Sequence, residues 1–190
     1  MMRIITGRAR GIKLDTLEGE MTRPTAERTK EAMFSMIQFS IEGRRVLDLF
    51  AGSGQLGLEA VSRGAAHATL VDQSKDAIRV IHKNAEKTRL SDDCTVVCAE
   101  FAEFIRSRRG RDAFDVVFLD PPYAMHAIPA AVEALLDARL LSSHALIVCE
   151  SGEGKPLGEG TALASKFEVV REARYGRAFV TVLTPAVEQE

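Results

Sequence analysis

The chain has 190 residues, 46% of them hydrophobic and 27% charged, and a formal net charge of −2 at pH 7. This length predicts one domain with a full hydrophobic core, and the composition is ordinary for a globular protein. The small net charge argues against a protein coated in positive charge, and no apolar stretch reaches the roughly 18 residues of a membrane-spanning helix. Because the start lacks an apolar core of signal-peptide length, the protein is expected in the cytoplasm.

The first predicted element is a small basic hairpin. Apolar runs at 3–6 and 12–14 surround a glycine-bounded turn, and residues 1–14 contain no acid but four basic residues, Arg3, Arg8, Arg10 and Lys13. This bias is compatible with a phosphate-rich partner, and equally with a solvated terminal segment. A polar link through Arg23 and Pro24 follows. Thr25 is then predicted to cap an amphipathic helix over about 26–40, where Ala32, Met33, Ile37 and Ile41 recur at helical spacing.

From residue 45 onward, strand and helix patterns alternate. Nearly continuous apolar runs lie at 45–49, 67–71, 94–98, 114–119 and 145–149, with helical patterns between them at about 55–63, 74–89, 100–108 and 127–138. Such runs are typical of a parallel sheet covered on both faces. Two alternating runs at 167–174 and 178–184 predict a closing antiparallel hairpin. We therefore expect an α/β fold in which residues 1–44 form an extension and residues 45–185 the main domain.

Cysteine and histidine spacing gives no support to a metal site. The three cysteines, Cys94, Cys98 and Cys149, lie in or next to apolar strand-like runs and are predicted to be buried free thiols. The four histidines are scattered along the chain without ligand spacing. We expect no bound metal.

A glycine loop follows the first predicted strand of the main domain. In DLFAGSGQLGLEA, Gly52, Gly54 and Gly57 form a GxGxxG between a strand and a helix, which lets a ligand approach the backbone closely. A tight turn that binds nothing is the alternative. Asp72 ends the second strand, where a carboxylate can accept both ribose hydroxyl protons. Glu100 follows the third strand, where a side chain or neighbouring backbone could meet an adenine edge. Since ligands bind at the carboxyl ends of parallel strands, this combination predicts an adenosine-containing cofactor.

Two cofactors share this layout, a dinucleotide and S-adenosylmethionine. Asp48 lies four residues before Gly52. Its carboxylate would sit poorly near a pyrophosphate but could attract the ammonium of a methionine moiety, directly or through water. This favours S-adenosylmethionine, while a purely structural role, in which Asp48 bonds the loop backbone, stays open.

The stretch FLDPPY ends the fourth predicted strand with a carboxylate, two prolines and a tyrosine. Asp120 and Pro121 both precede proline, so both are restricted to extended conformations, and neither proline has an N–H. The segment therefore presents the Asp120 carboxylate and the Pro121 carbonyl as two rigid acceptors, which suits an NH₂ group on a flat ring. These acceptors can direct the nitrogen lone pair at a methyl group and stabilise the charge that develops on nitrogen. Tyr123 would stack on the base; the alternative is a strand-terminating turn with Tyr123 in the core.

These motifs resemble a known family. DLFAGSGQLGLEA with DPPY downstream is similar to the S-adenosylmethionine-dependent amino-methyltransferases. RIITGRARGIKL, followed by RPTAERTKEAMF, is similar more narrowly to the RsmD-type methyltransferases of bacterial 16S ribosomal RNA, which modify a guanine N2. The resemblance spans about Arg3 to Leu183. It implies a Rossmann-like, seven-stranded class I methyltransferase fold acting on 16S ribosomal RNA, either naked or within a small-subunit particle.

The resemblance also implies site residues. The cofactor would be held by Asp48, Phe50, Ala51, Gly52, Ser53, Gly54, Asp72, Gln73, Glu100 and Phe101, and the target guanine by Asp120, Pro121, Pro122 and Tyr123. RNA contacts would come from Arg8, Arg10, Arg23, Thr25 and Arg28, with Lys13 and Lys30 adding positive field. The chain departs from the family pattern at Asp72, where glutamate is expected, and at Glu100, where aspartate is expected. Each change keeps the charge and shifts its reach by one methylene.

Other functions fit parts of this pattern. DPPY suits the amine of adenine as well as that of guanine, so a DNA adenine-N6 methyltransferase is one alternative. It is disfavoured because residues 1–44 leave no room for a separate sequence-reading domain. A nicotinamide-dependent oxidoreductase would use the same glycine loop, and an RNA-binding assembly factor would keep the fold without catalysis. The sequence identifies neither the methylated guanine nor the oligomeric state, and a monomer is assumed.

Overall fold

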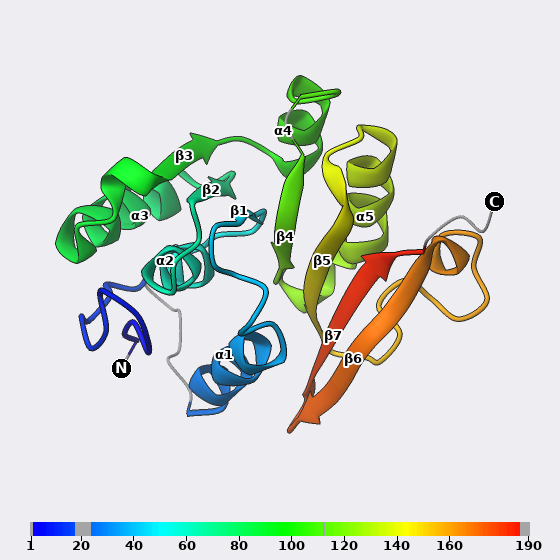
Figure 1. The fold of residues 1–190 in the computed structure, drawn as a ribbon, viewed down its shortest axis with the longest axis horizontal. Coiled ribbons are helices and arrows are strands. Elements are labelled where there is room, and N and C mark those ends of the chain that lie inside the picture. The colour runs from blue at the N-terminus through cyan, green and yellow to red at the C-terminus, as the bar shows by residue number, and fades with distance from the viewer. Residues whose placement is uncertain (1, 18–23, 112, 187–190) are drawn as a thin grey trace.

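The protein is built on one seven-stranded sheet in the order β3-β2-β1-β4-β5-β7-β6. The computed structural model describes residues 2–17, 24–111 and 113–186, with only the backbone at 24–26. Figure 1 shows the sheet running across the molecule, with the β6–β7 hairpin at one end and β3 at the other. The predicted mostly parallel sheet with a C-terminal antiparallel hairpin is confirmed.

The five predicted parallel strands are all present. They are β1 (Arg45–Asp48), β2 (His67–Asp72), β3 (Cys94–Cys98), β4 (Phe114–Leu119) and β5 (Leu141–Ser151). β7 (Ala178–Pro185) pairs antiparallel with β5 and with β6 (Phe167–Tyr175). β5 begins earlier than the apolar run 145–149 predicts, because a register shift between Phe114 and Val116 lets β4 pair as far back as Leu141.

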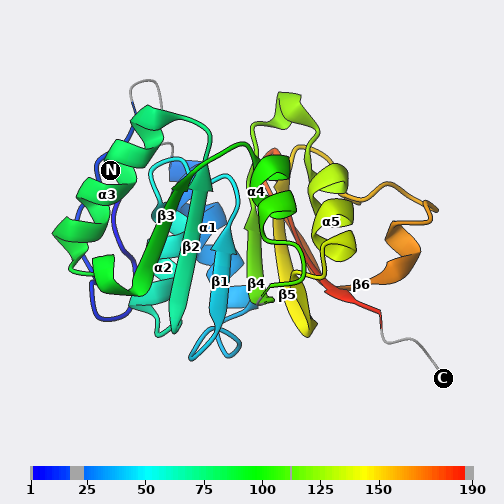
Figure 2. The same cartoon turned by 90° about the horizontal axis from the view of Figure 1, so that it is seen from above.

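Helices cover both faces of the sheet. α1 (Pro24–Met36), α2 (Gln55–Ser62) and α3 (Lys75–Thr88) share one hydrophobic cluster, and α4 (Phe101–Ser107) and α5 (Ile128–Asp137) share the other. Figure 2 shows the two groups on opposite sides of the strands. Short 3₁₀ turns follow α3 (η1, Ser91–Asp93), follow β4 (η2, Tyr123–Met125) and precede β6 (η3, Ala164–Lys166).

Helix α1 differs from its predicted bounds at both ends. It begins at Pro24, so Thr25 lies within the helix and does not precede it as a cap. It ends at Met36, four residues before the predicted end, because the chain turns with the Ser40 N–H donating to the Ile37 carbonyl at 2.8 Å. This turn keeps Ile37 and Ile41 in the core and leaves Phe39 94% exposed.

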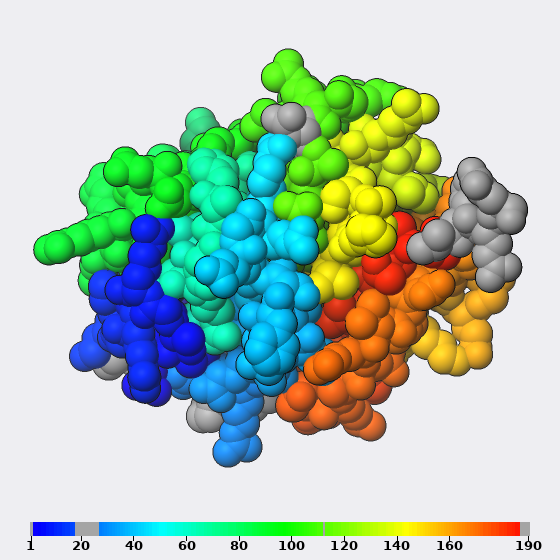
Figure 3. Space-filling model, in the orientation of Figure 1, coloured from blue at the N-terminus to red at the C-terminus, as the bar shows by residue number. Residues whose placement is uncertain are grey.

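The N-terminal segment forms the predicted hairpin and packs onto α2. Arg3 and Lys13 form an antiparallel bridge, and the Ile4 N–H donates to the Ile12 carbonyl at 3.0 Å. Ile4 and Leu14 belong to the same cluster as α1 and α2, so residues 2–17 share a core with the sheet. Figure 3 shows this segment (dark blue) and the α1 region (lighter blue) on one face of the molecule. The boundary at 44/45 stays a prediction.

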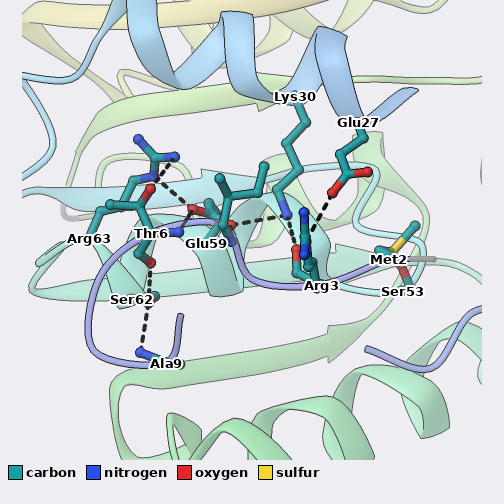
Figure 4. Close-up of polar contacts among 12 residues, drawn as sticks. Met2, Arg3, Thr6, Ala9, Glu27, Lys30, Ser53, Glu59, Ser62 and Arg63 are labelled. Carbon is teal, nitrogen blue, oxygen red and sulfur yellow. Dashed lines mark hydrogen bonds and ion pairs between the residues drawn. The ribbon is translucent and has the colours of Figure 1, made fainter. Parts of the chain in front are cut away.

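A buried carboxylate on α2 holds this segment in place. Glu59 is 0% exposed and accepts hydrogen bonds from the Ile5 N–H at 2.7 Å and the Thr6 N–H at 2.9 Å. Two cations complete its surroundings: the Lys30 ammonium at 3.1 Å and the Arg63 guanidinium at 2.8 Å (Figure 4). Burial lowers the pKa of Lys30, and the charge of Glu59 acts in the opposite direction. Glu59 therefore joins the hairpin, α1 and α2.

The tip of the basic hairpin is docked at the end of the same helix. The Ser62 hydroxyl donates to the Thr6 carbonyl at 2.6 Å and accepts from the Ala9 N–H at 3.0 Å (Figure 4). The Arg8 N–H donates to the Ser62 carbonyl at 2.9 Å. Gly7 lies so close that a Cβ there would be 1.7 Å from the Ser62 carbonyl oxygen, and its φ of +87° suits glycine alone. The turn that carries Arg8 and Arg10 is thus held rigidly on α2.

Removal of the Glu59 charge should be strongly destabilising. In Glu59→Gln, the Lys30 ammonium stays buried without a counter-charge, which costs about 3–5 kcal/mol of unfolding free energy, measurable by urea denaturation. Adding Lys30→Met removes the uncompensated charge, so the double variant should recover much of that loss. A single variant that loses less than about 1 kcal/mol would show that the carboxylate is not the anchor.

Candidate active site

One cavity of about 510 Å³ lies at the carboxyl ends of the parallel strands. It brings together residues from the loop after β1, the ends of β2 and β3, the DPPY segment and the end of β5. Its lining includes Phe50, Gly52, Asp72, Gln73, Glu100, Phe101, Asp120, Pro121, Pro122 and Tyr123. Six of the ten residues predicted to bind the cofactor therefore meet the four predicted to hold the target amine in one cavity.

The glycine loop contributes Gly52 to the lining of this cavity, and Ala51 and Ser53 of the same loop are buried in the protein. Gly52 and Gly54 have φ of +54° and +80°, and Gly54 is the N-cap residue directly before α2. The Ser53 hydroxyl donates to the Met2 sulfur at 3.1 Å. Ala51, Ser53 and Gly54 are not among the lining residues. They shape the loop, and Phe50 and Gly52 line the cavity.

Asp48 lies beneath the loop and is buried. Its Oδ2 accepts from the Gly57 N–H at 2.9 Å, which is the structural role left open by the sequence, and Asp48 does not line the cavity. Burial raises the pKa of its carboxyl to about 7; the Gly57 hydrogen bond opposes this shift and the nearby charge of Asp72 adds to it. Oδ1 is buried without a hydrogen-bond partner among the described residues. A buried acceptor in that state fits a donor or cation delivered by a ligand or its water.

The two acids after β2 and β3 are both tied to backbone N–H groups. Asp72 Oδ2 accepts from the Gly52 N–H at 2.9 Å and Oδ1 from the Ser74 N–H at 2.8 Å. Because a carboxylate has about four acceptor positions, Asp72 keeps capacity for ribose hydroxyls. Glu100 caps α4, its Oε2 accepting from the Ala102 and Glu103 N–H groups.

Two aromatic rings flank the part of the cavity next to these acids. The Phe50 and Phe101 ring centroids are 5.4 Å apart and tilted by 49°. Both side chains are partly exposed and both line the cavity. Such a pair can contact the faces of a flat heterocycle.

The DPPY segment leaves the sheet and enters η2. Pro121 is buried, Asp120 is half-buried, and Tyr123 is 47% exposed, so Tyr123 is not a core residue. The Tyr123 hydroxyl donates to Glu150 Oε1 at 3.0 Å. Burial raises the pKa of Tyr123, and the charges of Glu150 and Asp120 add to the shift. Burial also raises the pKa of Glu150, which the hydrogen bond from Tyr123 opposes.

Sequence reasoning missed Glu150, Leu17 and Met125, which also line the cavity. The position of Glu150 at the carboxyl end of the fifth parallel strand is a signal that could have found it. Leu17 shows that the N-terminal segment reaches the cavity. Asn84 fixes the path of the N-terminal segment: its side chain accepts from the Asp15 N–H at 2.8 Å and donates to the Ser53 carbonyl at 2.9 Å.

The predicted RNA-contacting residues separate into two groups. Arg8, Arg10, Lys13 and Arg28 are exposed, with Arg8 paired to Asp93. Lys30 is 4% exposed and bound to Glu59, so the prediction that it adds positive field at the surface is wrong. Arg23 and the side chain of Thr25 lie outside the described residues.

The cysteines are free, as predicted, but only Cys149 is buried. Cys98 is exposed at the end of β3, since β3 is an edge strand of the sheet, and the prediction of burial is wrong there. Among residues 2–17, 24–111 and 113–186, no group of three or more potential ligands could hold a metal ion. Within the same ranges, no helix has the length and apolarity needed to cross a membrane.

The raised pKa of Asp48 predicts a pH-dependent stability. Between about pH 4 and pH 7 the folded protein binds the Asp48 proton more tightly than the unfolded chain, so stability falls as the pH rises through this window. Asp48→Asn has no carboxyl proton to lose, so its stability should not fall in this window. In urea unfolding, the free energy of unfolding of Asp48→Asn minus that of the parent should be about 2 kcal/mol larger at pH 8 than at pH 5. Asp76→Asn, which changes an exposed carboxylate on α3, is the control. An equal gain at both pH values would contradict the assignment.

Comparison with known proteins places the chain in a family. The family model "Conserved hypothetical protein 95" matches residues 2–184. Ribosomal RNA small subunit methyltransferase D of Haemophilus influenzae is 37% identical over 82% of this chain and 81% of its own length. The putative rRNA methyltransferase YlbH of Bacillus subtilis is 33% identical over 95% and 97%.

Solved structures agree with this placement. The putative methyltransferase yhhF from Escherichia coli superimposes with a TM-score of 0.83 at 30% identity, covering 98% of this chain and 99% of that one. The predicted Rossmann-like class I methyltransferase fold is thereby confirmed. The chain belongs to the conserved hypothetical protein 95 family, which is the family of ribosomal RNA small subunit methyltransferase D.

Proposed function

We propose that this protein transfers a methyl group from S-adenosyl-L-methionine to the exocyclic N2 amine of a guanine in small-subunit (16S) ribosomal RNA, in the cytoplasm. One observation carries the proposal: a single cavity is lined both by the glycine loop with Asp72 and Glu100 and by Asp120 to Tyr123. A methyl donor and an amine must share one cavity to react. The name of the Haemophilus influenzae relative, at 37% identity, supports the RNA class.

The cavity fits the proposed cofactor. S-adenosyl-L-methionine supplies an electrophilic methyl group when bound. Asp72 would accept ribose hydroxyl protons, and Phe50 and Phe101 would contact the adenine faces. The unpartnered Asp48 Oδ1 would attract the methionine ammonium through water, since Asp48 does not itself line the cavity.

The DPPY segment supplies the acceptors for the amine. The Asp120 carboxylate and the Pro121 carbonyl would accept the two amine hydrogens, so that the nitrogen lone pair points towards the glycine-loop side of the cavity. Removal of one such partner costs about 3–4 kcal/mol in activation free energy. The exposed ring of Tyr123 is available for stacking on the base. A paired base would have to flip out of its helix to reach this position.

The function test is mass spectrometry of ribosomal RNA from a deletion strain. The expected result is the loss of one N2-methylguanine from small-subunit RNA, restored by the parent gene and by Asp137→Asn, an exposed control. Asp120→Ala should lower methyl transfer by about 10²- to 10³-fold and still bind S-adenosylhomocysteine in calorimetry.

Each alternative function has its own outcome. Methylated adenine in DNA would indicate the DNA methyltransferase. Binding of NAD without S-adenosylhomocysteine would indicate an oxidoreductase. Persistence of the modified guanine in cells that carry only Asp120→Ala would show that DPPY is not the catalytic element and would leave the assembly factor open.

The basic hairpin is proposed to track RNA phosphates. Arg8→Ala combined with Arg10→Ala should weaken RNA binding and reduce the slope of log K against log salt by up to about 2, with cofactor binding unchanged. Arg171→Ala, an exposed arginine on β6, is the matched control and should leave the slope as it is. If the salt slope of the double variant equals that of the parent, the two arginines are solvated surface residues that do not contact RNA phosphates.

A further inference from the structure

Glu150 lies beside Asp120 at the carboxyl edge of the sheet. β4 and β5 pair in parallel with Leu119 opposite Cys149; Asp120 directly follows β4, and Glu150 is the next residue of β5. Neighbouring strands are about 4.8 Å apart, and residues in register carry their side chains to the same side. Both residues line the 510 Å³ cavity. Two carboxylates from neighbouring segments therefore line the cavity in which the target base is proposed to bind.

Tyr123 holds the Glu150 carboxylate in this position. Its hydroxyl donates to Glu150 Oε1 at 3.0 Å, and its ring lies over Gly152, where an added Cβ would be 3.4 Å from ring atom Cδ2. Tyr123 and Glu150 also line a second hollow of about 340 Å³. The two residues are therefore shared by both spaces, and the hydrogen bond between them ties the carboxylate to the DPPY segment.

The purine amines differ in what lies next to them. On the Watson–Crick edge of guanine, the N2 amine is followed by N1–H, so two neighbouring donors face outward. On adenine, the N6 amine is followed by N1, which is an acceptor. Two adjacent carboxylates match two adjacent donors, and the adenine N1 lone pair would face a negative charge.

We propose that Glu150 accepts the N1–H of the target base and thereby selects guanine over adenine, while the Tyr123 hydroxyl orients its carboxylate. This inference rests on the proposed function, because it assigns a base to the cavity in which Asp120 holds the amine. It explains how a DPPY segment that recognises only an amine can act on one purine. Burial raises the pKa of Glu150, and the hydrogen bond from Tyr123 opposes that shift by favouring the ionised form.

The test compares guanine with 2-aminopurine at the methylated position. 2-Aminopurine keeps the N2 amine but has an acceptor at N1. The substrate is small-subunit RNA, free or assembled with ribosomal proteins, with either base introduced by ligation at the position found by mass spectrometry. The measured quantity is the ratio of kcat/KM for the two RNAs within each variant, so a loss of folded protein cancels.

The parent protein should prefer guanine, and Glu150→Met should lower that preference by about 10- to 100-fold, as expected for one lost base-edge contact. Glu150→Gln, which keeps one acceptor oxygen, should have a guanine preference between those of the parent and Glu150→Met. Tyr123→Phe should lower the preference less than Glu150→Met. Glu153→Gln, at an exposed carboxylate beside the second hollow, should leave it unchanged.

The outcomes separate the inference from the function. If the parent methylates guanine RNA and Glu150→Met keeps the parent preference, the role of Glu150 is overturned and the proposed function stands. If the parent methylates no guanine in this RNA, the proposed function itself fails.

Discussion

The site depends on one constraint, the parallel pairing of β4 with β1 on one side and β5 on the other. This pairing sets Asp48 opposite Phe118 and Leu119 opposite Cys149, which brings the loop after β1, the DPPY segment and Glu150 to one edge. Several carboxylates meet there at an electrostatic cost. Backbone N–H groups offset part of it, from Gly57 to Asp48 and from Gly52 to Asp72. The glycine loop is therefore needed for the stability of this edge as well as for access by a ligand.

Helix α2 connects the two halves of the proposed function. Its first turn follows Gly54 and so belongs to the glycine loop, while Glu59 and Ser62 near its end hold the basic hairpin. Residues 56–62 of this helix are all buried, and a buried helix transmits a displacement at one end to the other. The placement of the arginines that are proposed to contact RNA is thus fixed relative to the cavity by one short element.

Local pattern was sufficient to predict the strands, most helices and most of the residues that line the cavity, because parallel strands place their carboxyl ends together. It was insufficient where a partner distant in sequence decides. Lys30 is a surface residue by composition and is buried because Glu59, itself within an apolar helix, neutralises it. The position of Glu150 relative to Asp120 follows from the register of β4 with β5. The early start of β5 follows from a register shift in the same pairing. The end of α1 was set by the burial of Ile37 and Ile41, which a turn satisfies as well as a helix.

The distribution of charge explains how an acidic cavity can serve an anionic substrate. Asp72, Glu100, Asp120 and Glu150 line the cavity, whereas Arg8, Arg10 and Lys13 lie exposed on the hairpin. The first set would repel phosphates and the second would attract them, so the proposed mode of binding keeps the RNA backbone outside the cavity. The donor-rich edge of a base and a cationic cofactor are attracted inward. The same separation that excludes the backbone thus favours an extruded base, and it needs no large net charge, which agrees with the formal value of −2.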